Sequence, residues 1–277
     1  MVAIGKINTL EVYKFVDFGA YLDGEQYGPI LLPKKYMPQG LEIEQTIEVF
    51  VYLDSEDRLI ATTETPKAQV GDFAYLCVKD VNDYGAFLDW GLSKDLFVPY
   101  KEQKNKMTVG SYYWVYVYID SKTERIVATS KIGRYISEQK PQYNIGDQVH
   151  VIVHSQTDLG YKVIVDKSYW GILYANELFE PVEIAEQRVG YVHVVRDNNK
   201  LDIRLQKSGF QKMPDVQKKI LTLLKQHNGF LPFHDKSSPQ EIQTMFAMSK
   251  KTFKMAIGIL YKGGYIHILE NGISLVQ

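Results

Sequence analysis

Two aromatic side chains lie three residues apart in each of two short segments, where they could stack the bases of a nucleic acid. The pairs are Phe18 with Tyr21 and Tyr84 with Phe87, and a Gly-Ala dipeptide separates the two rings in each case. A glycine inside a strand permits a β-bulge, which would bring both rings to one face of a sheet. Bases stack on such rings with little dependence on sequence, at about 1–3 kcal/mol per base. The competing interpretation is that the rings fill a core, because aromatic side chains in strands are usually buried.

These segments belong to an internal repeat. Residues 17–23 (DFGAYLD) recur as residues 83–89 (DYGAFLD), 66 positions later, and the match continues at the same offset beyond this segment. A third, looser copy begins at Ile145 and has Asp158-Leu159-Gly160-Tyr161-Lys162-Val163 in place of the Gly-Ala segment. Each copy alternates apolar and polar residues with period two and is rich in Val, Ile, Tyr and Phe, which predicts strands joined by turns. A repeat of about 65 residues favours a small five-stranded barrel of the OB type over a propeller blade.

The C-terminal part follows a different pattern. After Met213 the apolar residues recur with a period of 3.6, and Ser238-Pro239 and Ser249 are typical first residues of two further helices. Asn271-Gly272 between two apolar runs predicts a two-residue hairpin turn. Three helices followed by a hairpin indicate a winged helix.

The predicted fold class is mainly β with a C-terminal α+β domain: three tandem OB-type β-barrels plus a winged-helix domain. The predicted domains are a first barrel at 1–66, a second at 67–136, a linker at 137–144, a third barrel at 145–210 and the winged helix at 211–277.

Composition and charge narrow the class of protein. Hydrophobic residues make up 45% and charged residues 23%, as in globular proteins. No run approaches the ~18 apolar residues that a membrane span needs, no signal peptide is recognisable, and Cys77 is the only cysteine, so we expect a cytoplasmic protein without disulfides. Residues 1–68 carry 6 basic and 11 acidic side chains, whereas residues 211–277 carry 9 and 4, which is a modest indication that the C-terminal domain meets a polyanion.

The second repeat resembles a known RNA-binding domain. Asp83-Tyr84-Gly85-Ala86-Phe87-Leu88, followed by Leu96-Phe97-Val98-Pro99, resembles the S-one domain, an OB barrel first known from a ribosomal protein. Three such repeats and a winged helix make the whole chain similar to the conserved virulence factor B family, and the segments 160–165 and 169–177 carry the most specific part of that likeness. The third repeat has Leu159 and Lys162 at the two platform positions and Tyr174 where family members often place a ring.

The resemblance implies a cytoplasmic bacterial RNA-binding protein that influences gene expression without catalysis or a cofactor. We expect its aromatic rings to bind single-stranded or loop RNA. The second repeat is the first choice as the binding site, because the first repeat is acidic and the third lacks the aromatic pair. Two alternatives stay open: a regulator whose winged helix binds duplex DNA, and an adaptor that docks proteins and binds no nucleic acid. The residues expected to contact nucleic acid are Phe18, Tyr21, Tyr84, Phe87, Phe97, Lys162, Tyr174, Lys250, Lys251 and Lys254.

Two further groups of residues have competing interpretations. Tyr112, Trp114, Tyr116 and Tyr118 share one face of a predicted strand, where they could stack bases, but contact with a neighbouring repeat is favoured. Lys250 and Lys254 share a helix face that could meet phosphates or merely be solvated. No phosphate loop, nucleophile elbow or metal-like histidine spacing occurs in the sequence, so neither an enzyme nor a metal site is predicted.

Overall fold

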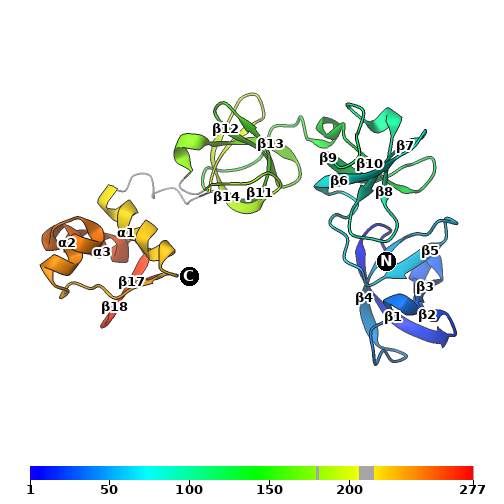
Figure 1. Ribbon diagram of the computed structural model, residues 1–277, viewed down its shortest axis with the longest axis horizontal. Coiled ribbons are helices and arrows are strands. Elements are labelled where there is room, and N and C mark those ends of the chain that lie inside the picture. The colour runs from blue at the N-terminus through cyan, green and yellow to red at the C-terminus, as the bar shows by residue number, and fades with distance from the viewer. Residues whose placement is uncertain (179–180, 206–214, 277) are drawn as a thin grey trace. The chain divides into compact units, whose positions relative to one another are not determined.

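Each of the three repeats forms a five-stranded β structure in the computed structural model, and the chain ends in a helical domain (Figure 1). The structure describes residues 1–178, 181–205 and 215–276. The chain divides into two units, Met1–Leu205 with the three barrels and Gln206–Gln277 with the helices. The predicted fold class is therefore confirmed, while the predicted boundary between residues 210 and 211 lies outside the described residues.

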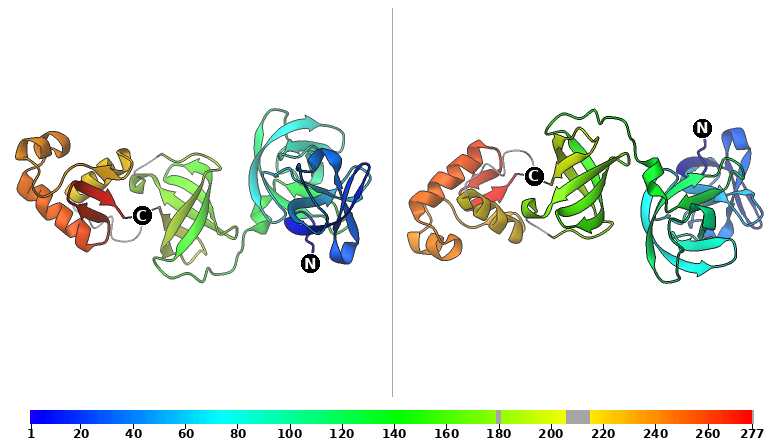
Figure 2. Two further views of the ribbon diagram at one scale, coloured as in Figure 1. Left: turned by 90° about the horizontal axis from the view of Figure 1, so that it is seen from below. Right: turned by 90° about the horizontal axis from the view of Figure 1, so that it is seen from above.

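The first and third repeats are closed barrels with the same strand order. The first has the order β1-β2-β3-β5-β4, and the third has β11-β12-β13-β15-β14, whose curved strands are visible in both views of Figure 2. The strands of the first barrel are β1 (Ile7–Val16), β2 (Gly19–Asp23), β3 (Pro29–Pro33), β4 (Thr46–Leu53) and β5 (Leu59–Thr62). Those of the third are β11 (Gln148–Thr157), β12 (Gly160–Val165), β13 (Tyr169–Tyr174), β14 (Gln187–Val195) and β15 (Leu201–Arg204).

The second repeat is a five-stranded sheet of order β10-β9-β6-β7-β8 that curves until β8 and β10 lie side by side. Its interior is filled by the alternate apolar residues of each strand, such as Val78, Leu88 and Val115. The strands are β6 (Phe73–Val81), β7 (Gly85–Asp89), β8 (Leu96–Pro99), β9 (Tyr112–Ile119) and β10 (Ile126–Thr129). A short 3-10 turn follows the third strand of each barrel: η2 (Lys34–Tyr36) after β3, η3 (Tyr100–Glu102) after β8 and η5 (Ala175–Glu177) after β13. Two further turns are η1 (Glu25–Tyr27) after β2 and η4 (Ile132–Tyr135) after β10.

The expected bulge lies in a different strand from the one predicted. The register shift occurs in β6, between Val78 and Asp80, and the corresponding shifts occur in β1 and β11. Gly85 instead allows β8 to approach, because a Cβ atom there would lie 2.3 Å from the carbonyl oxygen of Val98. The prediction of a bulge at the glycine was therefore wrong, and the glycine is required for close backbone contact.

The barrels of the first unit pack on one another through aromatic side chains. Phe50 of β4 contacts Trp90 of the second barrel, with ring centroids 5.6 Å apart. Phe73 of the second barrel shares a buried cluster with Ile152 and Ile164 of the third. Buried apolar contacts thus join the first barrel to the second and the second barrel to the third.

The second unit has the helices and hairpin expected of a winged helix. Ser238 caps its helix with a reciprocal Glu241 contact, and Ser249 accepts a hydrogen bond from the backbone N–H of Thr252, so both predicted helix starts are confirmed. A buried cluster around Phe246, Phe253 and Leu260 holds the helices against the sheet. The elements are α1 (Asp215–Gln226), β16 (Phe230–Leu231), α2 (Pro239–Phe246), α3 (Lys250–Lys262), β17 (Ile266–Leu269) and β18 (Gly272–Leu275).

The hairpin turn lies one residue earlier than predicted. Leu269 pairs with Gly272, which leaves Glu270 and Asn271 as the turn and places Gly272 inside β18. A Cβ atom at Gly272 would lie 2.2 Å from the carbonyl oxygen of Leu231, so this glycine permits β16 to join the sheet. Among the described helices, none is long and apolar enough to cross a membrane.

Candidate nucleic-acid interface

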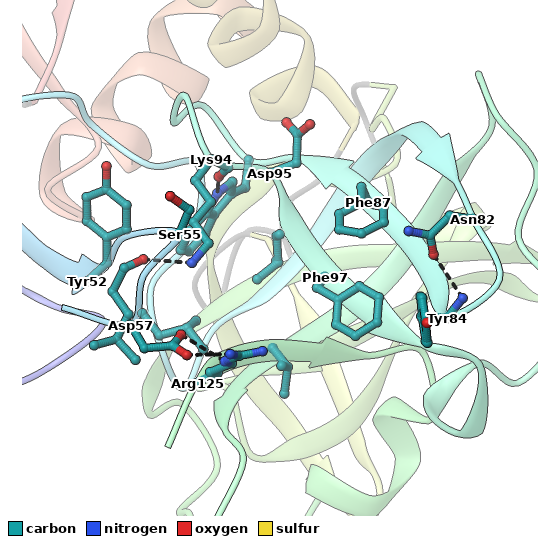
Figure 3. A pocket seen from close by; sticks show the side chains of 15 residues that line it. Tyr52, Ser55, Asp57, Asn82, Tyr84, Phe87, Lys94, Asp95, Phe97 and Arg125 are labelled. Atoms are coloured by element: carbon teal, nitrogen blue, oxygen red, sulfur yellow. Dashed lines mark hydrogen bonds and ion pairs between the residues drawn. The ribbon is translucent and has the colours of Figure 1, made fainter. Parts of the chain in front are cut away.

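Three aromatic rings that face outward from the second barrel line one open cavity. Phe87 of β7 lies directly opposite Phe97 of β8, and their ring centroids are 5.1 Å apart with an interplanar angle of 36°. Strand alternation explains their position, because the neighbours Ala86 and Leu88 are buried in the barrel and the two phenyl rings point outward. Tyr84, just before β7, is 77% exposed and borders the same cavity (Figure 3).

Local hydrogen bonds fix the segment that carries Tyr84. The backbone N–H of Tyr84 donates to the side-chain oxygen of Asn82 at 2.9 Å, which forms a tight turn before β7. The hydroxyl of Tyr100 donates to the backbone carbonyl of Asn82 at 2.6 Å. The exposed ring is therefore carried by an ordered turn, which lowers the entropic cost of stacking a base on it.

The wall opposite the rings comes from the first barrel. The cavity has a volume of about 620 Å³ and includes Tyr52 and Asp57 of the β4–β5 hairpin. Lys94 donates to the backbone carbonyls of Leu53 and Asp54 at 2.9 and 2.7 Å. Arg125 pairs with Asp57 through both guanidinium branches (Figure 3), with 2.9 Å between Nε and Oδ1. Both cations thus hold the first barrel beside the rings of the second.

The charges around this cavity are coupled. The hydrogen bond from Arg125 lowers the pKa of Asp57, and burial lowers the pKa of Lys94. Lys94 donates its hydrogen bonds to carbonyl oxygens, while the carboxylates of Asp57 and Asp54 attract its charge from nearby. The cavity thus places a cation and aromatic rings on one surface, a combination suited to contacting a phosphate and stacking a base.

The first barrel has an aromatic pair at the equivalent place. Phe18 is 57% exposed, and its ring meets that of Tyr21 edge to face at 6.4 Å. Lys14 lies with its Nζ atom 5.3 Å from the Tyr21 ring. Asp54 and Arg58, paired at 2.8 Å, line the same cavity and offset each other's charge.

The third barrel replaces the aromatic pair with a cation on an indole ring. Lys162 of β12 lies with its Nζ atom 3.5 Å from the centre of the Trp170 ring, and Leu159 is exposed beside them. Tyr174 lines the same cavity of about 410 Å³, where its hydroxyl accepts a hydrogen bond from Arg196. Trp170 was not among the predicted site residues, although alternation along β13 places it on the same face as Tyr174.

The aromatic residues of β9 do not share one environment. Tyr112 is 55% exposed and lies near Tyr75, whereas Trp114 donates its indole N–H to the backbone carbonyl of His154 in the third barrel at 2.8 Å. The ring of Tyr116 stacks on Tyr135 of η4, with centroids 3.8 Å apart. Tyr118 also lies beside Tyr135, and burial raises its pKa to about 12.

The lysines of the winged helix begin α3. Lys251 and Lys254 are exposed and Lys250 is partly exposed, so the first turn and a half of the helix presents three positive charges. Lys254 is 3.7 Å from the carboxylate of Asp235, which offsets part of its charge. No group of three or more His, Cys, Asp or Glu side chains in the described ranges is arranged to hold a metal ion.

Comparison with protein families identifies the modules. Residues 4–64 and 70–131 match the S1 domain family, and residues 218–275 match the CvfB-like winged helix domain family. The S1 matches cover the first two barrels, and the third barrel repeats the strand order of the first. S1 domains and winged helices bind nucleic acids, so the chain has a nucleic-acid-binding role.

Relatives share nearly the full length of the chain. The protein YitL of Bacillus subtilis is 29% identical over 97% of this chain and 92% of its own length. Conserved virulence factor B of Staphylococcus aureus strain USA300 is 27% identical over 99% of this chain and 94% of its own length. Among solved structures, a multidomain protein with nucleic acid binding domains from Streptococcus pneumoniae TIGR4 is 23% identical, with a TM-score of 0.40, over 99% of this chain and 98% of that one.

Proposed function

Since the chain belongs to the conserved virulence factor B family, with two matched S1 domains and a CvfB-like winged helix, we propose that it is a non-catalytic RNA-binding protein. It binds single-stranded or loop RNA by stacking unpaired bases on aromatic rings of its barrels. The winged helix adds a second, electrostatic contact. Binding of this kind would place the protein in the control of gene expression after transcription, in the bacterial cytoplasm.

The observation that carries this proposal is the exposed aromatic group of the second barrel. Tyr84 is 77% exposed on an ordered turn, beside the Phe87–Phe97 pair, in an open cavity that also contains the ammonium group of Lys94. A core role for Tyr84 is inconsistent with this exposure. Single-stranded nucleic acid combines flat bases with phosphates, which these groups suit.

A second candidate function is binding of duplex DNA by the winged helix. The observation in its favour is the cluster of Lys250, Lys251 and Lys254 at the start of α3. Lysines contribute charge but little base readout, so this contact would be largely independent of sequence. An adaptor role, with proteins docked on the aromatic faces, is the remaining alternative.

The deciding experiment is fluorescence anisotropy of the purified full-length protein with short single-stranded RNA, single-stranded DNA and duplex DNA. Each strand is titrated at two salt concentrations, because phosphate contacts weaken steeply with salt whereas stacking does not. We expect a preference for single-stranded RNA that persists at the higher salt. Preference for the duplex would transfer the function to the winged helix, and absence of binding to all three would favour the adaptor.

A further inference from the structure

A second open groove lies where the third barrel meets the second. Its volume is about 610 Å³, and its floor is formed by Trp114, His154 and Trp170. The imidazole of His154 stacks on Trp114 at a centroid distance of 5.2 Å and meets the edge of Trp170 at 5.1 Å. The groove thus has an aromatic floor that both barrels build together.

The side chains around this floor are positively charged. Lys104, Lys131 and Arg134 come from the second barrel and Lys162 from the third, and no carboxylate is among the described residues that line the groove. Arg134 is partly offset by Glu102, at 3.5 Å, just outside the groove. The ammonium group of Lys131 donates a hydrogen bond to the carbonyl of Lys101.

Lys104 and Lys162 are the cations available to a ligand. Neither has an ion pair with any described residue, and Lys162 is held on the Trp170 ring at 3.5 Å. Burial, together with the charges of Lys200 and Lys104, lowers the pKa of Lys162. The positive groups therefore repel one another without a counter-charge from the protein, and an anion between them would relieve that repulsion.

The groove continues into the binding face of the third barrel. Lys162 and Trp170 line both this groove and the cavity that contains Tyr174 and Lys200. A ligand that follows this surface meets spaced cations and flat rings in turn. An extended strand of phosphates with unpaired bases has that pattern, because it carries a flat base at every unit of the chain, whereas a run of acidic residues carries carboxylates without rings.

We propose that the groove between the second and third barrels binds the sugar–phosphate backbone of a single-stranded nucleic acid, with Lys104 and Lys162 on its phosphates. The inference rests on the proposed function, since it assigns a second contact for the same class of ligand. It adds a site that neither barrel forms alone, and it gives the packing of the two barrels a role in binding.

The test compares two double variants of the full-length protein. Lys104→Gln with Lys162→Gln removes the two groove cations, and Lys106→Gln with Lys122→Gln removes two exposed lysines of the second barrel outside the groove. Tryptophan fluorescence and thermal unfolding check that each variant is folded, and the single variant Lys104→Gln, at an exposed loop position, serves if the double variant is unstable. The ligands are a short single-stranded RNA, an abasic strand of the same length and a polyglutamate of the same charge.

The readout is the slope of the logarithm of affinity against the logarithm of salt concentration. Loss of two phosphate contacts lowers the slope by about 1.4 for a single strand, which corresponds to a roughly 25-fold loss of affinity at 0.1 M salt relative to the 1 M reference. We expect this change in the groove variant, for RNA and for the abasic strand, and none in the control variant.

If the groove variant binds RNA with the slope of the wild type, the groove assignment is overturned while the proposed function stands. If the wild type binds polyglutamate as tightly as RNA, the assignment to nucleic acid is overturned. If the wild type binds the abasic strand through the groove but gains nothing from bases, the stacking function fails and the groove stands.

Discussion

The indole ring of Trp114 in the second barrel stacks on the imidazole of His154 in the third, with planes 20° apart and a hydrogen bond of 2.8 Å from the indole N–H to the His154 carbonyl. The ring of Trp170 also contacts that imidazole, at a centroid distance of 5.1 Å and nearly at right angles. One titratable ring therefore contacts two indoles where the barrels meet. Its protonation state bears directly on how firmly the barrels pack.

Acidification should loosen this contact. Burial, with the charges of Lys162 and Lys104, lowers the pKa of His154 from 6.5 to about 4. Between these values the unfolded or separated state binds the proton and the packed state does not, so stability falls as the pH falls through this window and levels off below it. We expect the tryptophan emission to shift toward that of exposed indoles as the pH falls from 6.5 to about 4.

His154→Phe is the control for this prediction, because it keeps a flat ring between the indoles and cannot be protonated. The variant should keep a constant emission over the same pH range. Equal pH profiles for the variant and the wild type would show that other groups cause the change.

Removal of the Tyr84 ring should weaken RNA binding without destabilising the protein. The ring is exposed, so Tyr84→Ala should change the free energy of unfolding by no more than about 0.5 kcal/mol. Loss of one stacked base costs about 1–3 kcal/mol, which is roughly a 5- to 150-fold loss of affinity. The measurement is anisotropy with single-stranded RNA, paired with urea unfolding.

Tyr112→Ala is a matched control, since Tyr112 is an exposed tyrosine of the same barrel outside the ring-lined cavity. It should leave RNA affinity unchanged. A similar loss of RNA affinity in both variants would indicate a general effect of exposed rings. If Tyr84→Ala unfolds the protein, the ring stabilises the fold rather than binding RNA.

The barrels could be predicted because period-two alternation and the fixed offset between repeats can both be read from a single sequence, without knowledge of which strands pair. The function of the glycines was harder to predict. The backbone of Val98 lies close to Gly85, and that of Leu231 lies close to Gly272. A single sequence does not reveal that these strands pair. The sequence suggested a bulge at Gly85 and a hairpin turn at Gly272. In the structure, both glycines are required because another strand approaches them closely.

The candidate site was also only partly predictable. Tyr84 and Phe87 follow from their spacing, and Phe97 from its place in the repeat. The wall formed by Asp57 and Arg125 could not be predicted, because it depends on how two barrels pack. Trp170 could have been predicted, because it lies four residues before Tyr174 in the same strand and alternation therefore places both on one face.

The close approach at Gly85 gives a stability prediction. Gly85→Ala places a methyl group 2.3 Å from the Val98 carbonyl oxygen, and the strands can separate only by weakening the β7–β8 ladder. We expect a loss of about 1–3 kcal/mol in the free energy of unfolding, as for other overpacked sites. Fluorescence of Trp90, which is buried in this barrel, reports the transition in urea.

Gly133→Ala is the control for Gly85→Ala, because a Cβ atom at Gly133 would meet no atom within 4 Å. Its stability should equal that of the wild type. A stable Gly85→Ala protein would mean that β8 can move away from β7 at little cost, and the ring pair Phe87–Phe97 would then be less rigid than its geometry indicates.

Charge reversal at the start of α3 should separate the contribution of the winged helix from that of the barrels. Lys250→Glu with Lys254→Glu reverses two charges on one helix face, and Asp235 then faces a carboxylate where it had an ammonium group at 3.7 Å. If the winged helix adds phosphate contacts to an RNA already stacked on the barrels, the variant still binds single-stranded RNA. Its salt slope should fall by about 1.4, for two lost contacts.

Lys219→Glu with Lys236→Glu makes the same change of net charge at two exposed lysines of the same unit, outside the start of α3. This control should bind RNA with nearly the wild-type slope, because only local phosphate contacts alter counterion release. Complete loss of binding to every strand in the α3 variant, with the control intact, would make the winged helix the principal site. The barrels would then act on a nucleic acid that the helix had already bound, and Tyr84→Ala would have a much smaller effect than the stacking model requires.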